Sequence, residues 1–167
     1  TIDLNQPIKS ELHLSKFDLT ALLSQYPSAD IQGSGIIDGN LPFTLDLRKQ
    51  PTFTLNKGAL KADHSGGKIQ YQSAFGLKQT HQSMELVFNV LEDFHYSVLD
   101  SNVTYGTDKK LHIKLHLQGK NPNVENGRQV NFNIQLEEDL PALITTMQLS
   151  NQVSETIKNR IQEKLQQ

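Results

Sequence analysis

Residues 96–138 read YSVLDSNVTYGTDKKLHIKLHLQGKNPNVENGRQVNFNIQLEE, and this stretch decides the fold. A first run, rich in apolar residues, turns through residues 106–110 into two runs that alternate strictly between apolar and polar side chains. The apolar positions of these two runs are Leu111, Ile113, Leu115 and Leu117, then Val130, Phe132, Ile134 and Leu136. Period-two alternation bounded by Gly, Asn and Asp turns is typical of half-buried antiparallel strands. The stretch therefore predicts a meander with one apolar and one polar face.

Shorter strands are indicated on the N-terminal side. Residues 1–17 favour one strand, and residues 31–47 favour two strands joined by a turn at residues 38–40. Residues 53–71 favour three more, with turns at 56–58 and 65–67. The Gly33-Ser34-Gly35 motif is similar to a phosphate-binding loop, but such a loop needs a strand before it and a helix after it. Because a turn and a strand follow here, we interpret these glycines as bulge or close-packing positions.

Helical spacing interrupts the strands in three places. Asp18 is placed to cap a short helix that Pro27 ends, and a second helix is expected over residues 80–93. This second helix is apolar on more than one side, so we expect it to be well buried. Asp139 and Pro141 mark the start of a C-terminal helical region. Its last helix has mixed charges rather than the basic bias of a membrane-surface helix, and its apolar stripe is Val153, Ile157, Ile161 and Leu165.

These patterns predict an α+β fold: a curved antiparallel meander, β-taco-like, with two to four helices packed on the sheet or capping it. The 167 residues are expected to form a single domain, 1–167. The chain begins at Thr1 rather than at a methionine, so we interpret it as the C-terminal fragment of a much longer protein.

Composition excludes several classes of function. The net charge of −2 and the pI near 6.3 argue against nucleic-acid binding, which calls for a basic patch. The chain has no cysteine, so disulfides, thiolate nucleophiles and zinc ribbons are all excluded. A mean hydropathy of −0.48, without any long apolar run, indicates a soluble domain.

The residues also argue against catalysis. The six histidines are isolated or too far apart to share a metal: His112 and His116 lie four residues apart on one predicted strand, about 13 Å. The acidic run 137–139 could be read as a carboxylate pair or a calcium site. It is explained more simply as stabilising the positively polarised N-terminal end of the helix that follows it. Because no nucleophile elbow, metalloprotease motif or nucleotide-binding loop is present, we expect a binding or scaffolding protein that is not an enzyme and needs no metal or cofactor.

Two groups of motifs resemble known proteins. Residues 33–43, 57–62 and 66–71 are similar to the glycine-rich hairpins of AsmA-like envelope proteins. Residues 94–105, 117–122 and 127–133 resemble the C-terminal domain of the YdbH family, which also carries the label "dicarboxylate transport". The resemblance covers roughly residues 30–165.

The resemblance implies a periplasmic module of a large Gram-negative protein whose inner-membrane anchor lies outside this fragment. It implies an apolar groove that carries phospholipid between the inner and outer membranes, and a small outer-membrane lipoprotein that binds by edge-strand pairing. On this basis the expected lipid-facing residues are Leu111, Ile113, Leu115, Leu117, Val130, Phe132, Ile134 and Leu136.

Two alternatives stay open. If the helices over residues 80–93 and 140–165 bury their apolar sides against the sheet, the same eight residues form an ordinary core. The domain would then be a structural cap that docks the lipoprotein. Dicarboxylate binding rests on the family label alone, because a small dianion needs convergent cations and the arginines are few and scattered.

Overall fold

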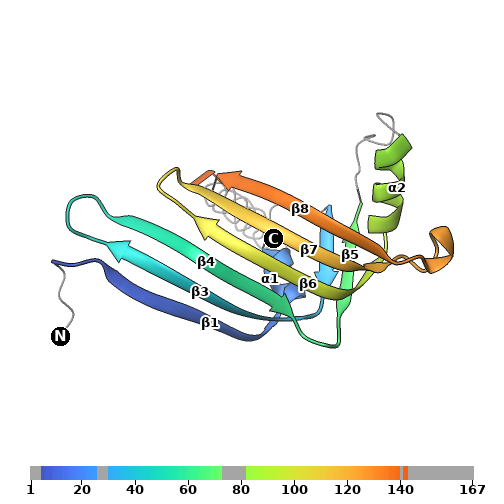
Figure 1. Cartoon of the computed structure of the whole chain (residues 1–167), viewed down its shortest axis with the longest axis horizontal. Coiled ribbons are helices and arrows are strands. Elements are labelled where there is room, and N and C mark those ends of the chain that lie inside the picture. The colour runs from blue at the N-terminus through green and yellow to red at the C-terminus, as the bar shows by residue number, and fades with distance from the viewer. Residues whose placement is uncertain (1–4, 26–29, 73–81, 140, 143–167) are drawn as a thin grey trace, which may run out of the picture.

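The computed structural model describes residues 5–25, 30–72, 82–139 and 141–142, with side chains of 82–84 excepted. In these residues the chain forms one antiparallel sheet of eight strands and two α-helices (Figure 1). The helices are α1 (Leu19–Ser24) and α2 (Gln82–Leu91). The strands are β1 (Ile8–Asp18), β2 (Ile31–Ser34), β3 (Ile36–Asp46), β4 (Thr52–Ala62), β5 (Gly67–Tyr71), β6 (Phe94–Tyr105), β7 (Lys110–Lys120) and β8 (Val130–Asp139).

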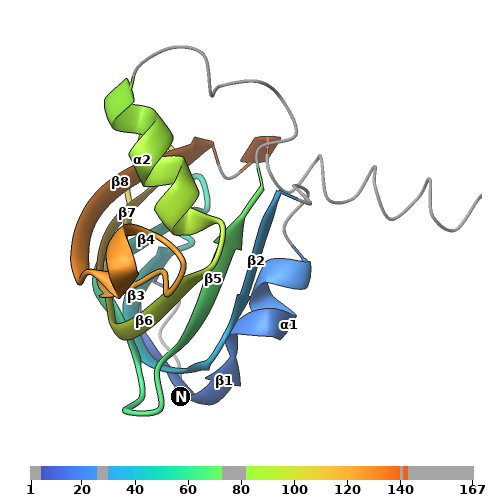
Figure 2. The same ribbon diagram turned by 90° about the vertical axis from the view of Figure 1, so that its right-hand side faces the viewer.

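The sheet is a meander once β2 and β3 are taken as one line of strand and β4 and β5 as another. β6 pairs with β5 near Phe94 and with β4 toward Tyr105, so β5 continues the line of β4 beside the same neighbour. β2 pairs with β5, and β3 pairs with β4, so these two also follow one line. β7 and β8 follow on the other side of β6, and β1 pairs with β3 at the opposite edge. In the end-on view of Figure 2, β8 lies on one side of the sheet and β5 and β2 on the other.

Tyr96 organises the place where these two lines break. Its hydroxyl donates a hydrogen bond to the Ser34 carbonyl oxygen at 2.8 Å. The next residue, Gly35, has a φ of +130°, which side chains rarely adopt, and a Cβ on Gly35 or Gly67 would collide with the tyrosine hydroxyl. The ring therefore occupies space that only glycines leave free. This outcome confirms the interpretation of the Gly33-Ser34-Gly35 motif as a close-packing feature.

The structure corrects two predicted turns. Residues 38–40 lie inside β3, and residues 56–58 lie inside β4, where Lys57 has a φ of 58° at an irregular pairing. The β3–β4 hairpin instead turns at residues 47–51, which include Pro51 but no glycine. Gly39 and Gly58 are typical turn residues, but here they continue their strands. Each leaves room for a side chain packed over it, Leu60 over Gly39 and Leu55 over Gly58.

Both described helices sit toward one end of the sheet. Asp18 caps α1, as predicted, by accepting a hydrogen bond from the Thr20 amide at 2.8 Å. α2 stands beside β5 (Figure 1), and Asn121 donates to the carbonyl oxygens of Asn89 and Val90 near its C-terminus, at 2.9 and 3.3 Å. The expectation that this helix is well buried holds only for the side that carries Val90, which is 4% exposed, since Leu86 is 46% exposed. The predicted C-terminal helices lie outside the described residues.

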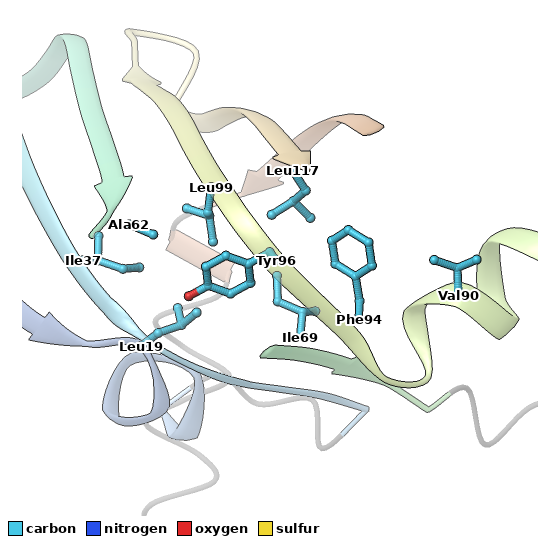
Figure 3. Close-up of a cluster of buried hydrophobic side chains, with 9 residues drawn as sticks. All are labelled: Leu19, Ile37, Ala62, Ile69, Val90, Phe94, Tyr96, Leu99 and Leu117. Carbon is cyan, nitrogen blue, oxygen red and sulfur yellow. The ribbon is translucent and has the colours of Figure 1, made fainter. Parts of the chain in front are cut away.

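The main core lies at this same end of the sheet. Figure 3 shows it between α1, α2 and the central strands: Leu19, Ile37, Ala62, Ile69, Val90, Phe94, Tyr96, Leu99 and Leu117. Phe94 and Leu117 are almost fully covered, and the Phe94 ring meets that of Phe132 edge to face at 5.3 Å. Burying each of these two side chains contributes about 2–3 kcal/mol, so this end anchors the sheet.

Candidate functional site

The strand register places nearly all apolar side chains on one face. Residues directly opposite in neighbouring strands point to the same side of a sheet. The row through Leu99 therefore includes Leu117 and Phe132, and the row through Val103 includes Ile113 and Leu136. The other face carries polar partners such as Asn102 and Lys114. We call the face with the apolar side chains the inner face and the opposite one the polar face.

The inner face divides into two halves along the strands. The core half, over the cluster of Figure 3, is closed by α1 and α2. The hairpin half runs toward the β3–β4 and β6–β7 turns. Its apolar residues are Ile8, Leu12, Leu41, Phe43, Leu45, Phe53, Leu55, Val103, Tyr105, Leu111, Ile113 and Leu136. Near its outer ends, Ser10 lies opposite Phe43 and Glu138 opposite Leu111 on the same face. None of these belongs to the core cluster. Leu12 is 51%, Phe53 41% and Leu136 45% exposed, whereas Leu55 and Val103, between them, are 8% and 7% exposed.

The eight residues singled out in the sequence separate between the halves. Leu117 is 1% exposed and belongs to the core cluster. Four more are partly buried and pack against that cluster: Leu115, Val130, Phe132 and Ile134. The remaining three, Leu111, Ile113 and Leu136, lie on the hairpin half. The shared face was predictable from period-two alternation, whereas the division required knowing where the helices pack.

An aromatic row crosses the hairpin half. Phe43, Phe53 and Tyr105 stand on three adjacent strands, with ring centroids 5.5 Å and 5.9 Å apart in succession. Such ring contacts add about 0.5–1.5 kcal/mol each beyond the area they bury. No local pattern predicts this row, because its members come from three different strands.

Ser101 interrupts the apolar character of the inner face. It lies opposite Leu60 on β4 and Leu115 on β7, where the core half meets the hairpin half. The residue is 5% exposed, and its hydroxyl has no hydrogen-bond partner. A buried polar group without a partner costs about 1–3 kcal/mol, so this hydroxyl calls for an explanation.

Charged pairs line the polar face near the hairpins. At the β3–β4 turn, Arg48 forms a two-point contact with Asp46 at 2.7 and 3.0 Å, and its hydrogen bonds lower the pKa of that carboxyl to about 2. At the β6–β7 turn, Lys110 contacts Glu137 and lowers its pKa. These pairs lie at the surface, so each contributes little to stability.

Two histidines form close contacts with carboxylates. His112 lies 3.0 Å from Asp108 and 3.6 Å from Glu137, through different ring nitrogens, and its hydrogen bond lowers the pKa of Asp108. His95 contacts Asp93 in the same way at 3.1 Å. Among the described residues, no three His, Asp or Glu side chains are placed to share a metal ion.

Comparison with known proteins identifies the family. Residues 1–162 match the model of the YdbH-like family, described as intermembrane phospholipid transport protein YdbH. The chain belongs to the YdbH-like family. This finding confirms the resemblance seen in the sequence. Searches of curated proteins and of solved structures found no match.

Two further observations bear on what this YdbH-like chain can bind. β1 and β8, at the two long edges of the described sheet, each pair on one side only, and the short strand β2 pairs only with β5. Across the described residues no helix is both long and apolar enough to cross a bilayer. The inner face and the two edge strands are therefore the surfaces on which a functional proposal can rest.

Proposed function

We propose that this domain is a module of an intermembrane phospholipid path, in which acyl chains lie against the hairpin half of the inner face. The family description supports a role in lipid transport. The observation that carries the proposal is the exposed apolar surface around Leu12, Phe53 and Leu136, on a face whose other half is closed. A contiguous apolar surface of this kind marks a site of interaction with a lipid or an apolar partner.

The bend of the sheet supports the same proposal. With β8 on one side and β5 and β2 on the other (Figure 2), the sheet bends around its inner face. The opposite, polar face carries charged pairs such as Arg48 with Asp46 and Lys110 with Glu137, and it faces water. In this arrangement Leu111, Ile113 and Leu136 contact lipid, while Leu117 and the residues packed beside it form the closed end.

The setting of the domain is part of the proposal. It places the chain in the periplasm, as part of an inner-membrane-anchored protein of a Gram-negative bacterium. The envelope location follows from a family described as intermembrane. The domain binds and guides lipid, and catalysis plays no part in this function.

Site-specific photo-crosslinking in cells tests the function. Probes at Phe53 and Leu136 are expected to form phospholipid adducts. A probe at Lys114, on the polar face, serves as the matched surface control. A probe at Leu117 should remain without lipid because the core covers this position. Adducts at none of the hairpin-half positions, in a folded protein, would refute the lipid path.

A second candidate function is a structural cap that docks a small outer-membrane lipoprotein. The edges of β1 and β8 favour it, since an extended segment can add to a strand that pairs on one side only. The same experiment separates the two: protein adducts along β8 without lipid adducts on the inner face indicate a cap.

Dicarboxylate binding finds no comparable support. Arg48 lies in the β3–β4 turn and contacts Asp46, whereas Arg128 lies beyond β7 at the other end of the sheet. These two arginines therefore cannot converge on one small dianion.

A further inference from the structure

We propose that the hairpin half holds one phospholipid and that the Ser101 hydroxyl donates a hydrogen bond to an ester carbonyl of that lipid. This inference rests on the proposed function and names the residue that positions the lipid.

Ser101 is unusual for its position. Apart from Ser101, the inner-face residues of β3, β4, β6 and β7 are aliphatic, aromatic or glycine. Ser101 is 5% exposed and unpartnered, between Leu60 and Leu115. An alanine there would avoid the cost of an unpaired hydroxyl, so a serine at this point suits a ligand that supplies an acceptor.

The charges of the face decide which acceptor fits. Among the described residues, no lysine or arginine lies on the inner face of these four strands. A phosphate or carboxylate buried at Ser101 would therefore lack a counter-charge, which is expensive in an apolar setting. An ester carbonyl is uncharged and accepts one hydrogen bond from a hydroxyl. Phospholipids carry this group at the junction between headgroup and acyl chains.

The dimensions agree with this placement. Ser101 and Tyr105 are four residues apart on β6, so the distance between them is about 13 Å at the usual strand rise. The acyl chains of one leaflet occupy about 15 Å, half the hydrocarbon thickness of a bilayer. Chains that start at Ser101 therefore pass over Val103 and Ile113 and end near the aromatic row.

A comparison of ester and ether lipids tests the hydrogen bond. The probes are a monomeric short-chain phosphatidylcholine and its ether-linked analogue, which lacks the carbonyls. Binding to the 167-residue chain is followed by the methyl NMR signals of Val103 and Ile113. The protein is expected to bind the ester lipid about fivefold more tightly than the ether lipid. In Ser101→Ala this preference should disappear, with the ether affinity unchanged.

A stability measurement and a control complete the test. Without lipid, Ser101→Ala should unfold at the same or higher denaturant concentration, since it removes an unsatisfied group. Thr104→Val removes a hydroxyl from the exposed side of the same strand and should keep the ester preference. Equal affinities for the two lipids in the unmodified protein, or a preference that survives Ser101→Ala, would overturn the inference but leave the proposed function standing. Binding of neither lipid would refute both.

Discussion

At the scale of single residues, Tyr96 holds together the point where two strand lines break. Tyr96→Phe keeps the ring but removes the hydrogen bond to Ser34. Because burial raises the pKa of Tyr96, its hydroxyl stays protonated as a donor at neutral pH. The variant should lose about 1 kcal/mol in the free energy of unfolding, measured by denaturant titration.

Gly67→Ala tests the same place sterically. Its new Cβ would collide with the Ser34 carbonyl oxygen and the Tyr96 hydroxyl. It should therefore destabilise the fold more than Tyr96→Phe does. Equal losses for the two variants would contradict the role given to the tyrosine ring.

The Asp46–Arg48 pair gives a prediction in pH. The pKa of Asp46 falls from 3.8 to about 2 in the folded chain, chiefly through the hydrogen bonds from Arg48. The pair's contribution to stability is therefore complete above the ordinary value and is lost as the pH falls toward about 2. In Arg48→Ala the carboxyl of Asp46 should titrate close to its ordinary pKa, as followed by NMR. The free energy of unfolding at neutral pH should hardly change, since the pair is exposed.

At the scale of elements, the side chain of Asn121 ties the connection after β7 to α2. Asn121 is 4% exposed, and its amide donates to two carbonyls near the C-terminus of the helix. Asn121→Ala leaves these groups with one partner fewer and should cost about 1–2 kcal/mol. Hydrogen exchange should then accelerate in α2 while the amides of β6 stay protected. Uniform acceleration across the sheet would show that α2 is not an independent unit.

The elements also show how far sequence reasoning reaches. The meander β6–β7–β8 was predictable because its strands alternate strictly and its turns contain Gly and Asn. Upstream, Gly39 and Gly58 resemble turn residues but serve close packing within long strands. The burial of α2 was overestimated, because the helix is apolar on more than one side and its neighbours do not cover every one of these sides: Leu86 stays exposed. The division of the inner face, and Ser101 at its boundary, depend on contacts between distant strands, which one sequence cannot supply.

At the scale of the whole molecule, the two halves of the inner face should respond differently to mutation. Leu136→Asp places a charge on the exposed hairpin half and should reduce phospholipid binding with little loss of stability. Gln135→Asp, the neighbouring position on the polar face, adds the same charge and should leave binding unchanged. Equal effects of the two substitutions on lipid binding would argue that net charge, rather than the inner face, governs it.

Leu117→Ala tests the closed half. It opens a cavity beneath Phe94 and should cost about 2–5 kcal/mol in the free energy of unfolding. Lipid binding under native conditions should persist, provided that the protein remains folded. Loss of binding in a folded Leu117→Ala protein would place lipid in the core half instead.

The meander also has a consequence for how the chain folds. With β2 and β3 taken as one line and β4 and β5 as another, each line of the described sheet pairs with the lines before and after it along the chain. Contacts between residues close in sequence reduce the entropy lost on closing loops, and proteins rich in them reach the native state sooner. Hairpins can therefore form in sequence, with the β6–β7 pair as a template for β8. The domain should fold faster than sandwiches of similar size whose strands pair across long connections.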